Sequence, residues 1–376
     1  MNILRINSWD GGNTGGAEVS IRREVQALEA LGHRNRSVAI VTEEPPVNIG
    51  VDETFIVRAN SSRARGLGEW LERVARDAAP DVIHLHHFRS GFRPLAKWLR
   101  SRREPIVLTA HDVDLICPVS TLTLPDGSHC RGEILPRCQF TGCPVGWGLP
   151  YKISQKRAFE ANVRRRVRKL ICVSEATRRA FKDLGYEDTT IIRPVIPKRD
   201  LVEIPKGRFV IGFLGRFDAQ KGIGTLLDAF KLAGIPDSGL LLVGRGPYVV
   251  PPGPAIRVEP WTGDVAQFFR RVHVLVCPST GWENLGNSPL EATSFGVPAI
   301  VSDSGGLPET VGSGEWGRVF HRGDARALAS ELAWVYGNYA AAKRAATIGS
   351  YLLVNEYSED VHMRKLLGVY REALAC

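Results

Sequence analysis

The stretch CPSTGWENLGNSPLEATSFGVPAIVSDSGGLPE, residues 277–309, predicts a strand end, a loop and a helix in direct succession. The apolar run at 272–277 that leads into it has the length and the β-branched content of a buried strand. After a loop rich in glycine, asparagine and serine, Ser288, Pro289 and Glu291 match a capping box, in which a serine and a glutamate hold N–H groups at a helix start. We therefore expect a helix that begins at Ser288.

The same stretch continues with the signals for a second strand. Gly296 is expected to end the helix, and an apolar run at 297–301 precedes a glycine-rich turn at 304–306. Strand, loop, helix and strand form half of a doubly wound parallel sheet, and such sheets bind ligands at the carboxyl ends of their strands. The loops after these two strands are therefore predicted to line a binding site.

Two acidic residues lie at this end of the predicted sheet, Glu283 in the loop and Glu291 in the first helical turn. Helix capping explains Glu291, and Glu283 taken alone is an ordinary solvated loop acid. In the binding interpretation, the two carboxylates accept hydrogen bonds from sugar hydroxyls while backbone N–H groups at the helix N-terminus hold a phosphate. The spacing of the two acids does not decide between these interpretations.

Length and composition indicate a globular protein of two domains. The chain has 376 residues, of which 44% are hydrophobic and 24% charged, and its formal net charge is +9. No apolar run approaches the ~20 residues that a membrane-spanning helix needs, and the N-terminus resembles a first strand rather than a signal peptide. We expect a cytoplasmic protein whose positive charge favours anionic partners, namely nucleic acid, phosphorylated ligands or an acidic membrane face.

The first half of the chain alternates between strand and helix patterns. This alternation predicts an α/β domain with a parallel sheet and helices on both faces. The expected strands are residues 2–7, 37–41, 55–57, 82–85, 106–109, 170–173 and 190–193. The expected helices are 17–31, 65–78 and 92–100, with another that Ser174 caps.

Two features of this half follow directly after strands. The first strand leads into a glycine-rich turn with Gly15 and Gly16, and glycines there let a ligand approach the N-terminus of the next helix. His111 follows the strand at 106–109, so it is either bonded to nearby backbone or part of a site at the sheet edge. The D-x-D pattern at 112–114 is too short to indicate a metal site without further ligands.

An irregular segment at 112–150 is too long to be a simple connection. It contains Cys117, Cys130, Cys138 and Cys143. These cysteines are ordinary thiols, ligands of a structural zinc or members of disulfides, although the C-x2-C pairs of common zinc modules are missing and nothing indicates export. The segment is also a candidate lid over an acceptor site.

A run of positive charge follows the insert. A basic helix is expected at 151–168, and it ends in the sequence RRRVRK at 164–169. Such a run is either a solvated helix face or a patch that contacts an acidic acceptor or a membrane. Pro194, Pro197 and Pro205 then indicate a linker between two domains.

The second half restarts the plan of alternating strands and helices. Its first elements are a strand at 209–214, a helix at 223–233, a strand at 240–243 and a turn at Gly244. The first strand leads into GRFDAQKG, residues 215–222. Arg216 and Lys221 in this loop lie beside a helix N-terminus, and two cations with a helix N-terminus make a cradle for a diphosphate without a metal.

Taken together, these motifs resemble those of the family-4 glycosyltransferases. The matching segments are GGAE at 15–18, LTAHD at 108–112, GRFDAQKG at 215–222, VGRGP at 243–247 and the stretch at 277–309. They occur in the family's order and cover both halves of the chain. The resemblance implies the GT-B fold, with two Rossmann-like doubly wound parallel-sheet domains that face a central cleft, and a retaining transfer of a sugar from a nucleotide-diphosphate sugar.

The resemblance also implies roles for individual residues. Arg216 and Lys221 match the pair that neutralises the donor diphosphate, and Glu283 matches the acid beside the transferred sugar. Glu291 matches the acid that binds the ribose, and His111 matches the histidine near C6 of the sugar. The further donor-binding residues implied in this way are Gly15, Gly16, Gly215, Gly244, Asn284, Leu285, Gly286 and Asn287.

The expected domains follow the family as well. They are an acceptor-binding domain at 1–197 with the insert at 112–150, a nucleotide-sugar domain at 206–350, and a C-terminal helix at 351–376 that crosses back to the first domain.

We therefore expect a hexosyltransferase of bacterial glycan, polysaccharide or glycolipid synthesis that needs no cofactor and no catalytic metal. Its donor would be a UDP- or GDP-sugar, and its partners a glycan or lipid-linked acceptor and an anionic membrane, without nucleic acid. One alternative is a sugar-nucleotide epimerase of the same fold, which needs a further acid/base set that the sequence lacks. The other is a non-enzymatic protein that binds anions or nucleic acid, which predicts aromatic residues in the basic run at 164–169, where there are none.

Overall fold

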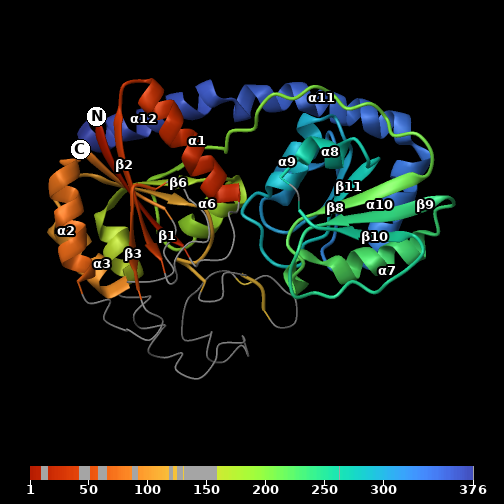
Figure 1. Cartoon of the computed structure of the whole chain (residues 1–376), viewed down its shortest axis with the longest axis horizontal. Helices are drawn as coiled ribbons and strands as arrows, with labels where there is room; N and C mark the ends of the chain where they lie inside the picture. The colour runs from red at the N-terminus through yellow and green to blue at the C-terminus, as the bar shows by residue number, and fades with distance from the viewer. Residues whose placement is uncertain are drawn as a thin grey trace. The chain divides into compact units, whose positions relative to one another are not determined.

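Two parallel sheets organise the chain, one in each of two units, in a computed structural model (Figure 1). The structure describes residues 1–9, 16–41, 51–57, 66–86, 92–117, 122–124, 130, 159–261 and 263–375. Unit 1 consists of Met1–Val195 with Glu359–Cys376, and unit 2 consists of Ile196–Ser358. No helix in the described ranges is both long enough and apolar enough to cross a membrane.

The described part of unit 1 contains a seven-stranded parallel sheet. Its strands are β1 (Asn2–Trp9), β2 (Arg34–Val41), β3 (Glu53–Ile56), β4 (Val82–Leu85), β5 (Ile106–Ala110), β6 (Val167–Cys172) and β7 (Thr189–Ile191). Its helices are α1 (Gly16–Ala30), α2 (Leu67–Ala78), α3 (Phe92–Ser101), α6 (Glu175–Lys182) and α12 (Glu359–Ala375), and residues 159–166 are helical as well. The strand order is β3-β2-β1-β4-β5-β6-β7, so the winding of the chain reverses between β1 and β4.

Helices cover both faces of this sheet. Figure 1 shows α1 and α12 on one face and α2 and α3 together on the other. On the first face, Ile3 of β1 and Val107 of β5 pack in one buried cluster with Leu28 of α1 and Leu366 of α12. The last helix of the chain is therefore part of the core of the first unit, since its apolar side chains fill the same layer as those of α1.

Unit 2 is built on a six-stranded parallel sheet. Its strands are β8 (Phe209–Leu214), β9 (Ser238–Val243), β10 (Ile256–Glu259), β11 (Val274–Cys277), β12 (Ala299–Ser302) and β13 (Arg318–Phe320). Its helical elements are η1 (Ala219–Lys221), α7 (Ile223–Ala233), α8 (Val265–Phe269), α9 (Asn287–Ser294), η2 (Leu307–Gly314), α10 (Ala325–Gly337) and α11 (Tyr339–Tyr357). The order β10-β9-β8-β11-β12-β13 reverses between β8 and β11.

Alternating side chains of the second sheet fill two separate layers. Leu240 and Leu242 of β9 lie in the cluster that contains the apolar residues of α7 and α10. Leu241 and Val243 lie in the cluster that contains those of α8 and α9. A strand that is buried on both faces reads as a continuous apolar run, which is why the sequence SGLLLV is a strand without polar alternation.

The two sheets confirm the predicted fold class, since both are doubly wound and parallel. Loops that follow the strands on either side of a reversal form a crevice, and this is where such sheets bind ligands. In unit 2 these are the loops after β8 and β11, which carry the GRFDAQKG motif and Glu283. The sequence places the returning helix from residue 351, whereas α11 of unit 2 extends to Tyr357 and α12 of unit 1 begins at Glu359.

The basic helix expected at 151–168 is wrong at its C-terminal end. The helix ends at residue 166, and Val167–Cys172 is strand β6, because this segment pairs with β5 and buries its apolar residues 170–172. Residues 151–158 lie outside the described ranges. Arg166 donates to backbone carbonyls in and after α3, Arg168 donates to a carbonyl of α12, and Lys169 forms ion pairs with two carboxylates. These cations therefore join elements of unit 1 instead of forming one solvated helix face.

Candidate active site

A half-buried ion pair lies where the loops after β8 and β11 meet in unit 2. The Nζ atom of Lys221 is 2.5 Å from Oε1 of Glu283, and the Ser279 hydroxyl donates to the same oxygen over 2.7 Å. The two charged side chains are 24% and 15% exposed. Burial acts to lower the pKa of Lys221, but the charge and the hydrogen bond of Glu283, together with a smaller contribution from Cys277, outweigh it, so the pKa is raised and the lysine stays cationic.

The loop after β8 reaches this position because of two local features. Asp218 accepts a hydrogen bond from the backbone N–H of Lys221, which forms the single turn η1. Gly222 follows with φ of 69°, and a Cβ atom there would overlap the backbone carbonyl of Pro278 after β11. Glycine is therefore needed for the close approach that brings Lys221 to Glu283.

Gly222 is also the N-cap of α7, and it provides no capping side chain. The positive end of the helix dipole and the N–H groups of its first turn therefore lie beside Lys221. A second cation, Arg216, lies in the same loop with 68% of its side chain exposed and with Asp218 3.5 Å away. The charge of Arg216 acts to lower the pKa of Lys221, as expected of a second cation in the same loop.

The loop after β12 holds Glu283 from the other side. The N–H of Gly306 donates to the backbone carbonyl of Glu283 over 2.8 Å. Gly305 has φ of 56°, and a Cβ atom at this position would overlap the same carbonyl. The backbone of Glu283 is thus fixed between two loops, while its carboxylate faces Lys221.

The expected capping box at Ser288 is wrong. Helix α9 begins at Asn287, and its N-cap is Gly286, which has φ of 94° and makes no side-chain capping bond. Ser288 lies inside the first turn, where its side chain is near the thiol of Cys277. Burial raises the pKa of that thiol to about 11, so it stays protonated. Because the helix starts two residues earlier than a Ser288 cap requires, capping does not explain Glu291.

The other residues expected to bind the donor lie in these loops as well. The side chain of Leu285 is buried, and Asn284 accepts a hydrogen bond from the indole N–H of Trp282. A Cβ atom on Gly244 would overlap the backbone carbonyl of Gly215, so the turns after β8 and β9 lie in direct contact. These positions bring the expected residues of unit 2 to one edge of its sheet.

Unit 1 contains a second, fully buried polar cluster around Arg5 of β1. NH1 of Arg5 donates to Oε2 of Glu24 over 2.8 Å and to Nε2 of His86 over 3.1 Å, and NH2 donates to the hydroxyl of Tyr370 over 3.1 Å. Arg5 is 0% exposed and Glu24 is 5% exposed. The cluster joins β1, α1, the end of β4 and α12, so it includes residues from both ends of the chain.

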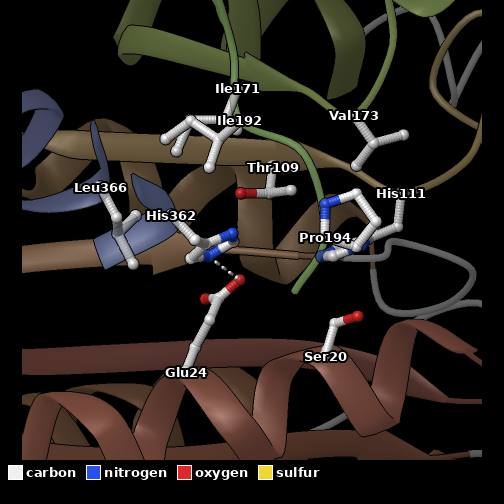
Figure 2. A pocket seen from close by; sticks show the side chains of 10 residues that line it. All are labelled: Ser20, Glu24, Thr109, His111, Ile171, Val173, Ile192, Pro194, His362 and Leu366. Carbon is white, nitrogen blue, oxygen red and sulfur yellow. Dashed lines mark hydrogen bonds and ion pairs between the residues drawn. The ribbon is translucent and has the colours of Figure 1, made fainter. Parts of the chain in front are cut away.

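His362 of α12 is the second cation of this cluster. Its Nδ1 faces the backbone carbonyl of Arg193 over 2.6 Å, and its Nε2 faces Oε1 of Glu24 over 3.1 Å. Both partners only accept hydrogen bonds, so both ring nitrogens must carry protons. In agreement, the pKa of His362 is raised, because Glu24 outweighs the effect of burial. Figure 2 shows Glu24 extending from α1 to His362.

The remaining histidines of the cluster lead from Arg5 to the edge of the sheet. His84 lies between the Tyr370 hydroxyl, 2.7 Å from Nδ1, and Thr109, 2.8 Å from Nε2, and burial holds its pKa well below the usual value. Nδ1 of His86 is 3.0 Å from Nε2 of His111. His111 follows β5 and lines a small pocket together with Ser20, Glu24 and His362 (Figure 2).

Sequence comparisons identify the family of the chain. The profile described as Glycosyltransferase Family 4 matches residues 14–198, and the one described as Glycosyl transferases group 1 matches residues 208–338. The chain belongs to the family-4 glycosyltransferases. These two matches cover the N-terminal and C-terminal halves, and they support neither the epimerase nor the non-enzymatic alternative.

The relatives of this glycosyltransferase differ in the share of their own length that the chain covers. It is 25% identical to the phosphatidyl-myo-inositol mannosyltransferase of Mycobacterium leprae, over 98% of this chain and 96% of that protein. It is 27% identical to the capsular polysaccharide biosynthesis glycosyltransferase CapM of Staphylococcus aureus, over 44% of this chain and 47% of that protein. The chain thus spans about half the length of CapM and nearly all of the mannosyltransferase.

Solved structures share the fold of the glycosyltransferase over its whole length. HepE of Anabaena in complex with UDP has a TM-score of 0.75 at 17% identity, with 99% of this chain and 100% of that chain covered. The sucrose-phosphate synthase of Thermosynechococcus elongatus has a TM-score of 0.74 at 19% identity, with complete coverage of both chains. These likenesses establish the GT-B fold for the glycosyltransferase.

The expected residues of unit 1 are described in part. Gly15 lies outside the described ranges, and Gly16 is the first residue of α1. Of the cysteines considered as zinc ligands, Cys117 is buried and Cys130 is half-buried, while Cys138 and Cys143 lie outside the described ranges. The zinc site therefore stays a prediction.

The cluster around Arg5 was not predicted from the sequence of the glycosyltransferase. Ligand atoms of Glu24, His84 and His86 lie within 4.8 Å of one another, which resembles a metal site. However, Arg5 donates to two of these three residues, so a guanidinium already provides the positive charge there. The one signal in the sequence is an arginine between the apolar residues Leu4 and Ile6 of the first strand, since such a residue is buried only when it is paired.

Proposed function

We propose that the protein transfers a hexosyl group from a nucleotide-diphosphate sugar to a hydroxyl acceptor, with retention of configuration and without a catalytic metal. The observation that carries this proposal is the cationic edge of the unit 2 sheet. Lys221, Arg216 and the uncapped N-terminus of α7 lie together there, beside the carboxylate of Glu283, which Lys221 and Ser279 hold by hydrogen bonds. This combination suits a ligand with a diphosphate at one end and hydroxyl groups at the other.

In this proposal each residue binds one part of the donor. Lys221 and Arg216 hold the diphosphate, and the turns at Gly215 and Gly244 lie beside it. Glu283 binds hydroxyl groups of the transferred sugar, and the backbone from Asn284 to Asn287 lines the same sugar. Glu291 binds the ribose, and Gly15, Gly16 and His111 are further donor-binding residues.

The reaction breaks the bond between C1 of the sugar and the oxygen of the diphosphate, and it forms a bond between C1 and the acceptor oxygen. The acceptor proton passes to the leaving diphosphate, so atoms and charge balance without a further reagent. Negative charge grows on the diphosphate as the bond breaks, and fixed cations stabilise it most when they are in place beforehand. Attack from the face that the diphosphate leaves gives retention. Lys221 and Arg216 provide charge that a metal ion would otherwise provide.

The Lys221–Glu283 pair prepares both groups for this task. An ammonium group has three donors, and Glu283 takes one of them. Lys221 therefore remains oriented at the sheet edge before the donor arrives, while a diphosphate accepts its other donors. The binding of the donor therefore costs little conformational entropy at the Lys221 side chain.

We propose a UDP- or GDP-sugar as the donor and a glycan or a lipid-linked sugar as the acceptor. The relatives support this class, since one is a phosphatidyl-myo-inositol mannosyltransferase and HepE has been solved with UDP-glucose. A lipid-linked acceptor places the enzyme at the cytoplasmic face of an anionic membrane, which its net charge of +9 favours. Sedimentation with vesicles of neutral or anionic lipid tests this contact, which added salt should weaken.

The release of nucleoside diphosphate tests the proposed function directly. The purified protein is incubated with UDP- and GDP-sugars, with and without extracts that contain candidate acceptors. Release that depends on the acceptor supports transfer, and the anomeric configuration of the product by NMR tests retention. A donor sugar that is altered without an acceptor would instead indicate an epimerase. Activity that disappears with EDTA and returns with a divalent cation would contradict the metal-independent mechanism.

A further inference from the structure

The histidine at the edge of the unit 1 sheet is connected to a buried arginine through a second histidine. We propose that Arg5 is a positioning residue for His111: acting through His86, it fixes His111 as a neutral imidazole with its proton on Nδ1. This inference rests on the proposed function for the role of His111 at the donor sugar. The assignment of its proton rests on the contacts of the described residues alone.

The first step concerns the proton of His86. NH1 of Arg5 lies 3.1 Å from Nε2 of His86. A guanidinium in a protein is always protonated and only donates hydrogen bonds. Nε2 of His86 must therefore offer its lone pair, so this histidine is neutral and carries its one proton on Nδ1.

The second step passes this constraint to His111. Nδ1 of His86 is 3.0 Å from Nε2 of His111, and the two ring planes differ by only 29° with centroids 5.2 Å apart. The rings thus meet edge to edge, with the N–H of one directed at the lone pair of the other. Because Nε2 of His111 accepts this hydrogen bond, its own proton is on Nδ1. Protonation of Nε2 would leave two N–H groups facing each other.

The third step is the rigidity of the arginine that starts the chain of hydrogen bonds. Arg5 is 0% exposed, and its side chain is held at separate nitrogens by Glu24 and Tyr370. Glu24 is itself held by His362. Burial acts to lower the pKa of Arg5, but its interactions with Tyr370 and with the carboxylate of Glu24 together outweigh this effect, so the pKa is raised. The donor to His86 is therefore fixed in place and stays charged.

A neutral His111 suits the proposed chemistry better than a cationic one. Positive charge develops on the sugar ring as its bond to the diphosphate breaks, and an imidazolium beside the ring would oppose it. The charged or titratable groups nearby in the described residues are His84, His86, Asp112, Glu24, His362 and Arg5. The pocket already contains one cation, His362. A neutral His111 therefore avoids a second positive charge beside the sugar ring.

The proton positions are tested by NMR of the full chain with 15N-labelled histidine. Two-bond 1H–15N spectra distinguish a protonated ring nitrogen from an unprotonated one, and the His111→Gln and His86→Phe variants assign the signals. We expect both rings to be neutral with the proton on Nδ1 at about pH 7. A proton on Nε2 of His111, or an imidazolium at this pH, would overturn the proposal.

A pair of variants at His86 tests whether the chain of hydrogen bonds acts on His111. His86→Asn places an amide N–H near the position of Nδ1, so it keeps a donor to His111, whereas His86→Phe removes the donor. We expect His111 to keep its tautomer in His86→Asn and to lose it in His86→Phe. Arg5→Met should have the same effect as His86→Phe, and circular dichroism shows whether this variant folds. If it does not fold, the His86 pair alone decides the matter.

The pH profile of transfer provides a readout that a merely structural role would not change. Without the donor from His86, His111 gains a proton at higher pH, so the acidic limb of kcat/KM should move up by about one pH unit in His86→Phe. His86→Asn should leave this limb where it is in the wild type. Equal limbs in all three proteins would refute a positioning role. A wild type that releases no nucleoside diphosphate would instead refute the proposed function, and the NMR spectra would not be affected.

Discussion

Each unit of this glycosyltransferase contains a glutamate paired with a basic side chain, and the two pairs differ in almost every physical respect. In unit 1 Arg5 and Glu24 are 0% and 5% exposed. Both oxygens of Glu24 are used within the protein, one by Arg5 and one by His362. In unit 2 Lys221 and Glu283 are 24% and 15% exposed, and they lie at the edge of the sheet.

This difference separates a pair that supports the structure from one that is available to a ligand. A charge inside a protein is stable only when its partners are complete, and the removal of one partner is then strongly destabilising. A half-buried pair beside a helix N-terminus loses less on mutation and keeps donors for an anion. We therefore expect changes in unit 1 to affect stability first, and changes in unit 2 to affect activity first.

The largest expected effect tests the structural side of this comparison. Glu24→Gln should lower the free energy of unfolding by about 3–5 kcal/mol, because it leaves Arg5 and His362 with an uncompensated charge. Urea denaturation measures this change. Glu29→Gln on the exposed side of the same helix is the control and should have almost no effect. Equal stabilities of the two variants would remove the distinction between the two pairs.

The next effect tests the ligand-binding side. Lys221→Ala should lower kcat/KM by about 10²–10³-fold, because a fixed cation no longer stabilises the leaving diphosphate. Its free energy of unfolding should fall by no more than about 1 kcal/mol, as for a solvent-accessible pair. The control is Lys231→Ala, which removes an exposed lysine from α7. A Lys221 variant with normal turnover would show that the cationic edge does not bind the donor.

A smaller effect concerns the pH dependence of the stability that His362 contributes to unit 1. The raised pKa of His362 means that its pairing with Glu24 is fully stabilising below about pH 6.5, the value of an unfolded histidine. This contribution is lost as the pH rises through the folded pKa, so the stability advantage of the wild type over His362→Gln should shrink by up to about 1.4 kcal/mol per pH unit.

The control for this measurement is His321→Gln, because His321 pairs with Asp303 on the surface, where the two side chains are 74% and 40% exposed. Its difference from the wild type should be small at every pH. A difference between the wild type and His362→Gln that grows as the pH rises would contradict the assignment of His362 as an imidazolium.

The smallest expected effect tests whether the stability of α12 is limited by its helix propensity or by its buried contacts. Gly368 lies within α12, and a Cβ atom there would meet nothing within 4 Å. Gly368→Ala should therefore raise the free energy of unfolding by about 0.5–1 kcal/mol. Gly349→Ala in α11 is the matched opposite, since its Cβ would overlap the ring of Trp316. A destabilised Gly368→Ala would mean that α12 is packed more tightly than the structure shows.

Local patterns predicted much of unit 2 because its elements are defined by neighbours in the sequence. The strand Phe209–Leu214 and the helix Ile223–Ala233 have the bounds that the apolar runs and Gly234 indicate. The start of α9 was predicted wrongly although a capping box was present, because Gly286 adopts the N-cap position two residues earlier. A local motif therefore indicates that a helix begins nearby, but backbone contacts with other loops select the residue.

The sequence by itself determined the two parallel sheets, the cationic loop at 215–222 and the family, because apolar runs and glycine turns act over short distances. The family resemblance predicted that the C-terminal helix returns to the first domain, but only the tertiary structure decided which of its residues meet the first strand. Arg5 and Tyr370 are 365 residues apart, yet their side chains are in hydrogen-bond contact. No local pattern specifies such a pair, because the free energy that compensates a buried charge comes from whichever residues the fold brings to it.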